Sequence, residues 1–347
     1  MSEILHTYLP IVHTFGEDIF GTLLWPLVWS VVKIMILLAP VLFMVTYITL
    51  AERKIIGAMQ VRPGPNRAGI FGVLLPLADA VKLMTKETIL PKHADLPVFF
   101  LAPALTLVPA LVVWTVVPFS PDLVVADVNI AIMFILAISS LGAYGVLMAG
   151  WASNSRYAFL GSMRAASQMI SYEVSMGFTL IPVIMLTGSL SLIDVVEAQK
   201  DVWNIVPLLP MFVIFFISVV AETNRAPFDL PEAEAELVAG FITEYSAMSS
   251  GVFFMGEYAN IVMVSFLGAL MFLGGWLPPI GLLDFIPGLV WLALKAGFLM
   301  FVFLWLRATF PRYRYDQLMR LGWKVFLPVS LFWIFLTGLV LHLTGNA

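Results

Sequence analysis

Long apolar runs recur along this sequence and leave few folds open to it. A run of about 20 apolar residues is what an α-helix needs to cross a bilayer. The chain of 347 residues is 61% hydrophobic and only 12% charged, whereas soluble domains carry about 25% charged residues. The sequence therefore predicts one all-α, polytopic membrane domain over residues 1–347, a helical bundle of about eight transmembrane helices plus an interfacial amphipathic helix. The predicted spans are residues 23–50, 97–118, 128–151, 166–187, 203–221, 248–276, 285–306 and 325–343.

The residues that usually hold redox groups are missing or scattered. The chain has no cysteine, so it cannot by itself build an iron–sulfur cluster or a thiolate site. It has four histidines, no two of them in one predicted span, and it has no Gly-rich dinucleotide or P-loop motif. We therefore expect no metal site and no redox centre on this chain, and any electrons would come from a partner.

Basic residues alternate between successive loops. The odd-numbered connections carry nearly all the loop arginines and lysines, while the even-numbered connections hold only Lys200. Cytoplasmic loops are enriched in Lys and Arg, so the odd-numbered loops are predicted to face the cytoplasm or its topological equivalent. Both termini are then expected on the opposite side of the membrane.

The first of these loops, residues 51–98, has an unusual composition. Residues 51–54 are expected to leave the membrane, and the prolines and glycine of residues 62–67 predict a turn. Residues 68–87 follow, apolar but with charges at one end, and we predict a helix that lies along or dips into the interface. An ordinary amphipathic connector is the alternative. The side chains predicted to face lipid or a lipid-like molecule are Ile70, Phe71, Leu74, Leu77, Val81 and Met84.

A second charged loop, residues 221–247, lies between two apolar spans and is strongly acidic. Its one basic residue is Arg225. Part of the acidity has a structural explanation, because Asp229, Pro231 and Glu232 fit a capped helix start. Two interpretations stay open: a solvated acidic loop, and a titratable cluster that serves protons or cations. The carboxylates of this segment are Glu222, Asp229, Glu232, Glu234, Glu236 and Glu244.

Charged residues also lie inside the predicted spans. Glu173, Glu257 and Lys295 fall in the fourth, sixth and seventh spans, and Lys33 in the first. A charge at the bilayer centre costs ~2.5–3.5 kcal/mol on insertion scales, so such a group usually faces protein or water and marks an ion or proton path. A buried ion pair or a snorkelling end residue is the structural alternative.

Several stretches resemble a known family. The segment PFDLPEAEAELVAG, residues 227–240, is similar to one signature of the quinone-site membrane subunit of respiratory complex I, the proton-pumping NADH:quinone oxidoreductase. The segment GVLLPLADAVKLMTKE, residues 72–87, resembles a second signature, and AERKIIGAMQVRPGPNRAG, residues 51–69, also fits. Length and span count agree, so the resemblance covers nearly the whole chain. One departure is Leu75, where the family often has glutamine.

The resemblance implies a membrane subunit that forms the entrance and one wall of a quinone chamber and couples quinone reduction to proton translocation. Flavin mononucleotide and iron–sulfur clusters would sit only on partner subunits, and the substrate would be ubiquinone or menaquinone. It also implies a bacterial inner membrane with periplasmic termini, or the mitochondrial equivalent, and partners in both arms of the complex. The residues expected at the quinone are Arg62, Phe228, Arg225, Arg53 and Arg67. Those expected to couple protons are Glu222, Asp229, Glu232, Glu234, Glu236, Asp79, Glu173 and Glu52.

Two other functions stay open from the sequence. Membrane-bound hydrogenases and related complexes contain a similar subunit without a quinone. A stand-alone ion or proton transporter is a different class, and such transporters often show repeated halves with broken helices. No internal repeat of that kind is visible in this sequence.

Overall fold

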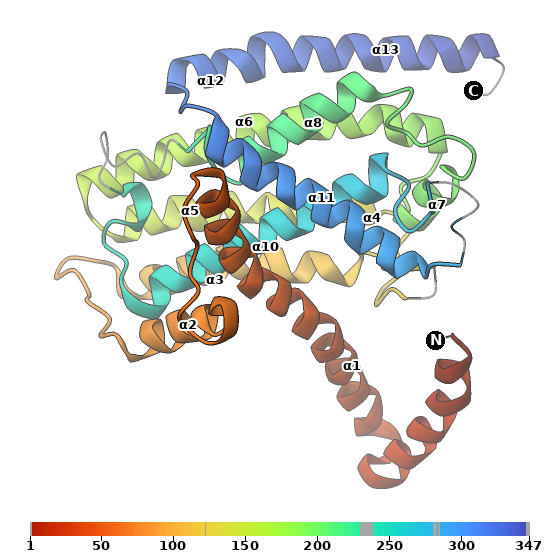
Figure 1. Cartoon of the computed structure of the whole chain (residues 1–347), viewed down its shortest axis with the longest axis horizontal. Helices are drawn as coiled ribbons and strands as arrows, with labels where there is room; N and C mark the ends of the chain where they lie inside the picture. Colours follow the sequence, from red (N-terminus) through yellow and green to blue (C-terminus); the bar gives the residue numbers. More distant parts are fainter. Residues whose placement is uncertain (1, 122, 230–238, 280–282, 284, 345–347) are drawn as a thin grey trace.

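The chain folds into a bundle of long helices, seen here in a computed structural model (Figure 1). The structure describes residues 2–121, 123–229, 239–279, 283 and 285–344. Over these residues it forms no β-strand, only one isolated bridge between Ser120 and Leu123, which confirms the predicted all-α membrane bundle. The elements are α1 (Ser2–Met59), η1 (Ile70–Gly72), α2 (Leu75–Thr85), α3 (Leu96–Val112), η2 (Val113–Thr115), α4 (Ala131–Ser139), α5 (Leu141–Ala152), α6 (Arg156–Thr187), α7 (Leu192–Glu197), α8 (Leu209–Glu222), η3 (Gly240–Ile242), α10 (Ala247–Phe272), α11 (Gly288–Thr309), α12 (Tyr315–Leu321), η5 (Gly322–Phe326) and α13 (Leu327–Thr344).

Among the described residues, 7 helical segments are long and apolar enough to cross a membrane. They match the predicted spans except the fifth, residues 203–221. There the helix is α8, which begins only at Leu209 and has 14 residues. Pro207 and Pro210 explain the late start, because proline disfavours helix before it and suits a first turn. The 7 spanning segments are Leu27–Met59, Leu96–Thr115, Ala131–Ala152, Arg156–Thr187, Ala247–Phe272, Gly288–Thr309 and Tyr315–Thr344.

Helix α1 differs from its prediction at both ends. It starts at Ser2 and is interrupted at Gly21, whose backbone has φ 74° and ψ 161°. It then continues without a break to Met59, so residues 51–54, expected to leave the membrane as a loop, are its last turns. This correction matters for Glu52, which lies on a rigid helix and is buried.

Helix α10 forms the centre of the bundle. Its second half, ANIVMVSFLGALMF, is apolar on nearly every side, and a helix of that kind is buried all round. Almost every residue from Ala259 to Phe272 is buried, and α10 packs against α1, α2, α3 and α11. In Figure 1 it runs through the middle of the molecule, with α13 on the outside beyond α6 and α8.

Helix α6 packs closely on its neighbours through small residues. A side-chain carbon added at Gly150 of α5 would lie 2.1 Å from the Ser162 hydroxyl, and one at Gly161 would lie 2.6 Å from the Gly240 Cα. Small residues allow membrane helices to approach at such short range. This approach holds η3 against α6 at Gly240.

The predicted interfacial helix, residues 68–87, is split in two. A short turn, η1, precedes α2, and Pro76 lies in the first turn of α2 instead of the middle of one long helix. The predicted apolar side chains are exposed, as expected for a surface that meets lipid or a lipid-like molecule. Their exposed fractions are 81% for Ile70, 73% for Phe71, 53% for Leu74, 62% for Leu77, 53% for Val81 and 71% for Met84.

Candidate functional site

A buried ion network joins α1, α10, α11 and the loop after α8. Glu52 of α1 pairs directly with Arg307 of α11 and lies 3.8 Å from Arg225 of the loop. Arg225 also lies 3.7 Å from Glu257 of α10. The next residue, Tyr258, donates its hydroxyl to Glu52 at 2.7 Å, and its ring lies 4.3 Å beneath the Arg225 guanidinium. Residues far apart in the sequence thus form one electrostatic unit.

The charges in this network balance. Two carboxylates, Glu52 and Glu257, face two guanidinium groups, Arg225 and Arg307, and the side chains of Glu52 and Arg225 are less than a tenth exposed. Burying such charges is costly, so each must keep a partner, and removing one partner alone is strongly destabilising. A balanced, buried network therefore responds strongly to any charge that appears or disappears beside it.

The loop that carries Arg225 is held by side chains from other elements. Gln168 of α6 donates to the Ala221 carbonyl at 2.7 Å and to the Phe228 carbonyl at 2.8 Å. Arg312 donates to Asp229 at 3.1 Å, and the Tyr313 amide donates to the Pro227 carbonyl. The segment after α11 and the loop after α8 therefore form one structural unit, which the sequence alone did not indicate.

Glu222 and Glu257 line one small cavity. It has room for about 30 Å³ of water and is also lined by Thr106, Asn224 and Asn260. A cavity this large can hold a water molecule when polar groups surround it. Glu222 Oε2 and Asn224 Oδ1 are buried there, with no hydrogen-bond partner among the described residues. The cavity therefore suits water that would bridge the two carboxylates.

Glu173 extends this set of carboxylates along α6. It is partly buried on α6, which packs against α8, the helix that ends at Glu222. Glu222, Glu257 and Glu52 are thus connected through the cavity and Arg225, with Glu173 beside them. The structure brings together Glu52, Glu173, Glu222 and Arg225 from the predicted set.

Asp79 lies apart, in a surface cluster on α2. It pairs with Lys82 at 2.8 Å and with Arg53 at 3.0 Å. The hydrogen bond from Lys82 lowers the pKa of the Asp79 carboxyl, partial burial opposes this, and the Arg53 charge lowers the pKa further. Arg53 thus has a structural partner, and the cluster links α1 to α2 outside the buried network.

The other residues predicted to contact quinone lie in different surroundings. Arg62 and Arg67 are exposed, and Arg62 donates to Gln60 at 2.7 Å. Phe228 is 5% exposed; its ring stacks on Tyr172, at 6.2 Å between ring centroids, and is tilted against Tyr313, at 5.6 Å. Neither Arg62 nor Phe228 lines the cavity between Glu222 and Glu257. The predicted site residues Glu232, Glu234 and Glu236 lie outside the described residues.

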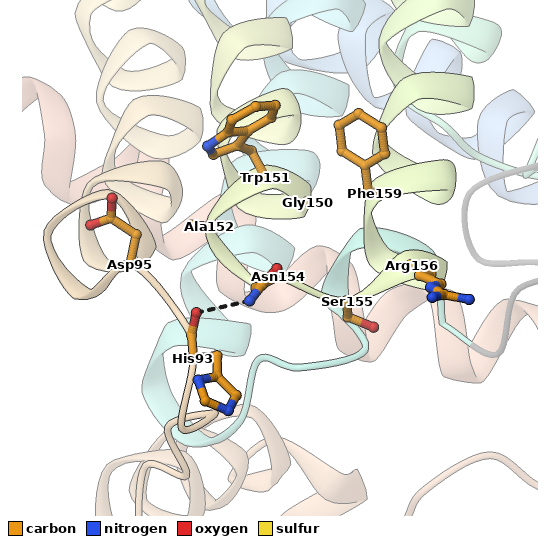
Figure 2. Close-up of a pocket in the computed structure, with 9 residues that line it drawn as sticks. All are labelled: His93, Asp95, Gly150, Trp151, Ala152, Asn154, Ser155, Arg156 and Phe159. Carbon is orange, nitrogen blue, oxygen red and sulfur yellow. Dashed lines mark hydrogen bonds between the residues drawn. The ribbon is translucent and has the colours of Figure 1, made fainter.

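A larger hollow of about 450 Å³ lies where α5 ends and α6 begins. Figure 2 shows Asn154 joined to the His93 carbonyl below Trp151 and Phe159. The two aromatic rings meet edge to face at 6.0 Å. None of the predicted site residues lines this hollow, so its size does not make it the functional centre.

Lys295 of α11 is held by two backbone carbonyls and an aromatic ring. Its ammonium donates to the carbonyls of Gly275 at 3.0 Å and Leu277 at 2.6 Å, and it lies 4.2 Å from the centre of the Trp203 ring. This charge anchors the turn after α10, as a cation near a helix C-terminus can.

Among the described residues, no group of three or more His, Cys, Asp or Glu side chains could hold a metal ion.

Four residues at the site were missed by the sequence interpretation: Gln168, Tyr258, Arg307 and Arg312. Arg225 pairs with Glu52 and Glu257, and Arg312 pairs with Asp229. Tyr258 directly follows Glu257, and Arg307 lies near the end of a span, so both could be noticed in the sequence. Their contacts with Glu52, far away in the sequence, could not be predicted.

Comparisons with known proteins agree along the chain. The family described as NADH dehydrogenase matches residues 32–338. The chain is 70% identical to the H-type subunit of NADH-quinone oxidoreductase from Magnetococcus marinus, over 98% of this chain and 99% of that protein. It is 57% identical to the protein of the same name from Rhodospirillum rubrum, over 92% and 96%. It is 55% identical to that of Rickettsia rickettsii, over 95% and 98%.

Proposed function

Because this chain belongs to the NADH dehydrogenase family, as its match to NADH-quinone oxidoreductase subunits along nearly its full length shows, we propose that its buried ion network couples quinone reduction to proton movement. The chain is a membrane subunit of a proton-translocating NADH:quinone oxidoreductase, and it acts as an enzyme only as part of that complex. The observation that carries the proposal is Arg225, which bridges Glu52 and Glu257 next to the cavity that Glu257 shares with Glu222.

We propose that quinone reaches the site past α2. The exposed apolar side chains of α2 and η1 suit an isoprenoid tail, and charged side chains are near in sequence: Arg62 and Arg67 lie between α1 and η1, and Arg53 lies near the end of α1. Phe228 and Arg225 belong to the loop at the other end of this proposed passage. Flavin mononucleotide and the iron–sulfur clusters that deliver electrons would be held by partner subunits in the peripheral arm.

The coupling we propose is electrostatic. Quinone reduction supplies a change of charge in a region of low dielectric constant, where charges act strongly on nearby titratable groups. Glu52 would respond first, because it is buried and its carboxylate lies beside the Arg225 guanidinium. Glu257 would respond through Arg225, and water in the cavity would carry a proton between Glu257 and Glu222.

Further carboxylates would extend this path. Glu173 lies on α6, which packs against the helix that ends at Glu222, and Asp229, held by Arg312, precedes Glu232, Glu234 and Glu236 in the sequence. Asp79 would act at the α2 surface and not within the buried network. A bacterial inner membrane with periplasmic termini, and ubiquinone or menaquinone as substrate, complete the proposal.

The two other functions are less well supported. A hydrogenase-type subunit would keep the network but lack the quinone, whereas the relatives named above carry NADH-quinone oxidoreductase names. A stand-alone transporter does not explain why the chain matches one subunit of a larger complex along nearly its full length.

Glu222→Gln tests the proposal in membranes that contain the assembled complex. The substitution keeps the size of the side chain but removes its ability to carry a proton. We expect a normal amount of complex and lower inhibitor-sensitive NADH:quinone reduction coupled to pumping. Full turnover with normal pumping would remove Glu222 from the coupling path.

A further inference from the structure

We infer that Gln168 is a positioning residue that makes Phe228 and Glu222 move together, an inference that rests on the proposed function. Gln168 lies in the middle of α6 and is fully buried. Its amide nitrogen donates to Ala221, the residue before Glu222, at 2.7 Å and to Phe228 at 2.8 Å. One side chain therefore joins the end of α8 to the far end of the loop.

The orientation of this amide follows from its partners. Both partners are backbone carbonyls, which only accept hydrogen bonds, so the nitrogen with its two hydrogens must face them. Gln168 Oε1 then points elsewhere, and it is buried with no hydrogen-bond partner among the described residues. Both donor hydrogens thus serve the bridge between α8 and the loop.

The bridge spans residues with different proposed roles. Phe228 packs on Tyr172 and Tyr313 and belongs to the quinone side, while Glu222 lines the cavity with Glu257. The loop between them has its own bonds: Phe228 N to Arg225 O at 2.8 Å, Arg225 N to Val220 O at 3.4 Å and Asn224 N to Ala221 O at 3.2 Å. Gln168 adds a direct link between the carbonyls of Phe228 and Ala221 that bypasses these loop bonds, so a shift of Phe228 reaches α8 less completely without it.

The chain offers a matched control in Gln199. This residue is also fully buried, and its amide nitrogen also donates to two carbonyls, those of Val195 at 3.0 Å and Leu270 at 2.8 Å. Its oxygen accepts two more bonds, from Asn204 N and Gly274 N. Gln199→Met therefore removes four hydrogen bonds, whereas Gln168→Met removes two. If lost bonds alone mattered, the control would be the more damaging variant.

The experiment compares Gln168→Met and Gln199→Met in closed membrane vesicles that contain the whole complex. Proton uptake is measured per NADH oxidised, and NADH:quinone reduction is measured separately in leaky vesicles. For Gln168→Met we expect a partial loss of the protons taken up per NADH, judged independently of the rate of reduction in leaky vesicles, because the two bonds between α6 and the loop are gone. For Gln199→Met we expect less complex but a normal ratio in what assembles.

Each other outcome has a defined meaning. A normal ratio in Gln168→Met, or an equal fall in both variants, overturns the inference. If Gln168→Met does not assemble, Gln168→Asn keeps the amide but can reach only one carbonyl, and an intermediate ratio is expected. Failure of both to assemble assigns Gln168 a structural role and also overturns the inference. Glu222→Gln, tested in parallel, separates the two claims, because a normal result there overturns the proposed function itself.

Discussion

Replacing Arg225 with methionine should destabilise the complex, and the cost should shrink when Glu257 is neutralised as well. Arg225→Met keeps the apolar stem but removes the charge. At 3.8 and 3.7 Å, each carboxylate attracts the guanidinium by about 4 kcal/mol at an effective dielectric constant of about 20. Because desolvation offsets part of this attraction, removing one partner from a buried network costs about 3–5 kcal/mol overall.

Glu257→Gln removes the charge of one carboxylate that contacts Arg225, whereas the other, Glu52, still pairs with Arg307 in Arg225→Met. The double variant should therefore lose less than the sum of the single variants, by about 0.5–3 kcal/mol, as for other residues in contact. The measurement is the rate at which intact complex disappears from native gels on heating, where a tenfold rate change corresponds to about 1.36 kcal/mol. This readout does not depend on activity.

An exposed arginine supplies the control. Arg156→Met, at the start of α6, should change the same rate by no more than the equivalent of about 0.5 kcal/mol, as at other surface positions. Additive losses for Arg225→Met and Glu257→Gln would show that the two residues do not act as a pair. Their contact would then contribute no free energy to the stability of the complex.

Three further predictions concern residues around the network. The pKa of the Asp79 carboxyl is lowered in the folded protein. Its stabilising effect is therefore present above the unfolded pKa of about 3.9 and is lost as pH falls through the lower folded pKa. The hydrogen-exchange rates of α2 should differ between wild type and Asp79→Asn at pH 7 and become equal at acidic pH. Gly161→Ala would place a carbon 2.6 Å from Gly240 and should cost about 1–3 kcal/mol, seen as less assembled complex; normal amounts would contradict the close approach. Lys295→Met should cost about 1–3 kcal/mol through two carbonyls left without their donor, with an unchanged ratio of protons to NADH; a changed ratio would assign this lysine to the proton path.

The spans could be predicted because their signal is local. Each apolar run is long enough to form a helix that buries its own backbone bonds in lipid, whatever its neighbours are. The fifth span was the exception, since apolar composition alone does not reveal that Pro207 and Pro210 delay the helix to Leu209. The end of α1 also differs from its prediction, because charges at residues 52–54 favoured a loop, whereas the helix continues to Met59 and Glu52 pairs with Arg307 from another helix.

The site could be predicted only in part, for a related reason. Glu52, Glu222 and Arg225 were recognisable as charges in unusual surroundings, or from their motif. Their partners depend on which helices pack together, and Arg307 lies 255 residues from Glu52 in the sequence. Gln168 carried no signal at all, because a single amide in a span is chemically ordinary until its two carbonyl partners are known.

The short length of α8 has a consequence for how the chain is made. Its 14 residues extend only about 21 Å at 1.5 Å per residue, less than the roughly 30 Å of a bilayer core. A nascent helix of that length is too short to cross the bilayer core by itself, and its last backbone carbonyls need hydrogen-bond donors from elsewhere. Helix α6, which is already synthesised, supplies both a packing surface and, at Ala221, one such donor. Because α6 precedes α8 in the sequence, the helix that stabilises the fifth hydrophobic segment is made before it.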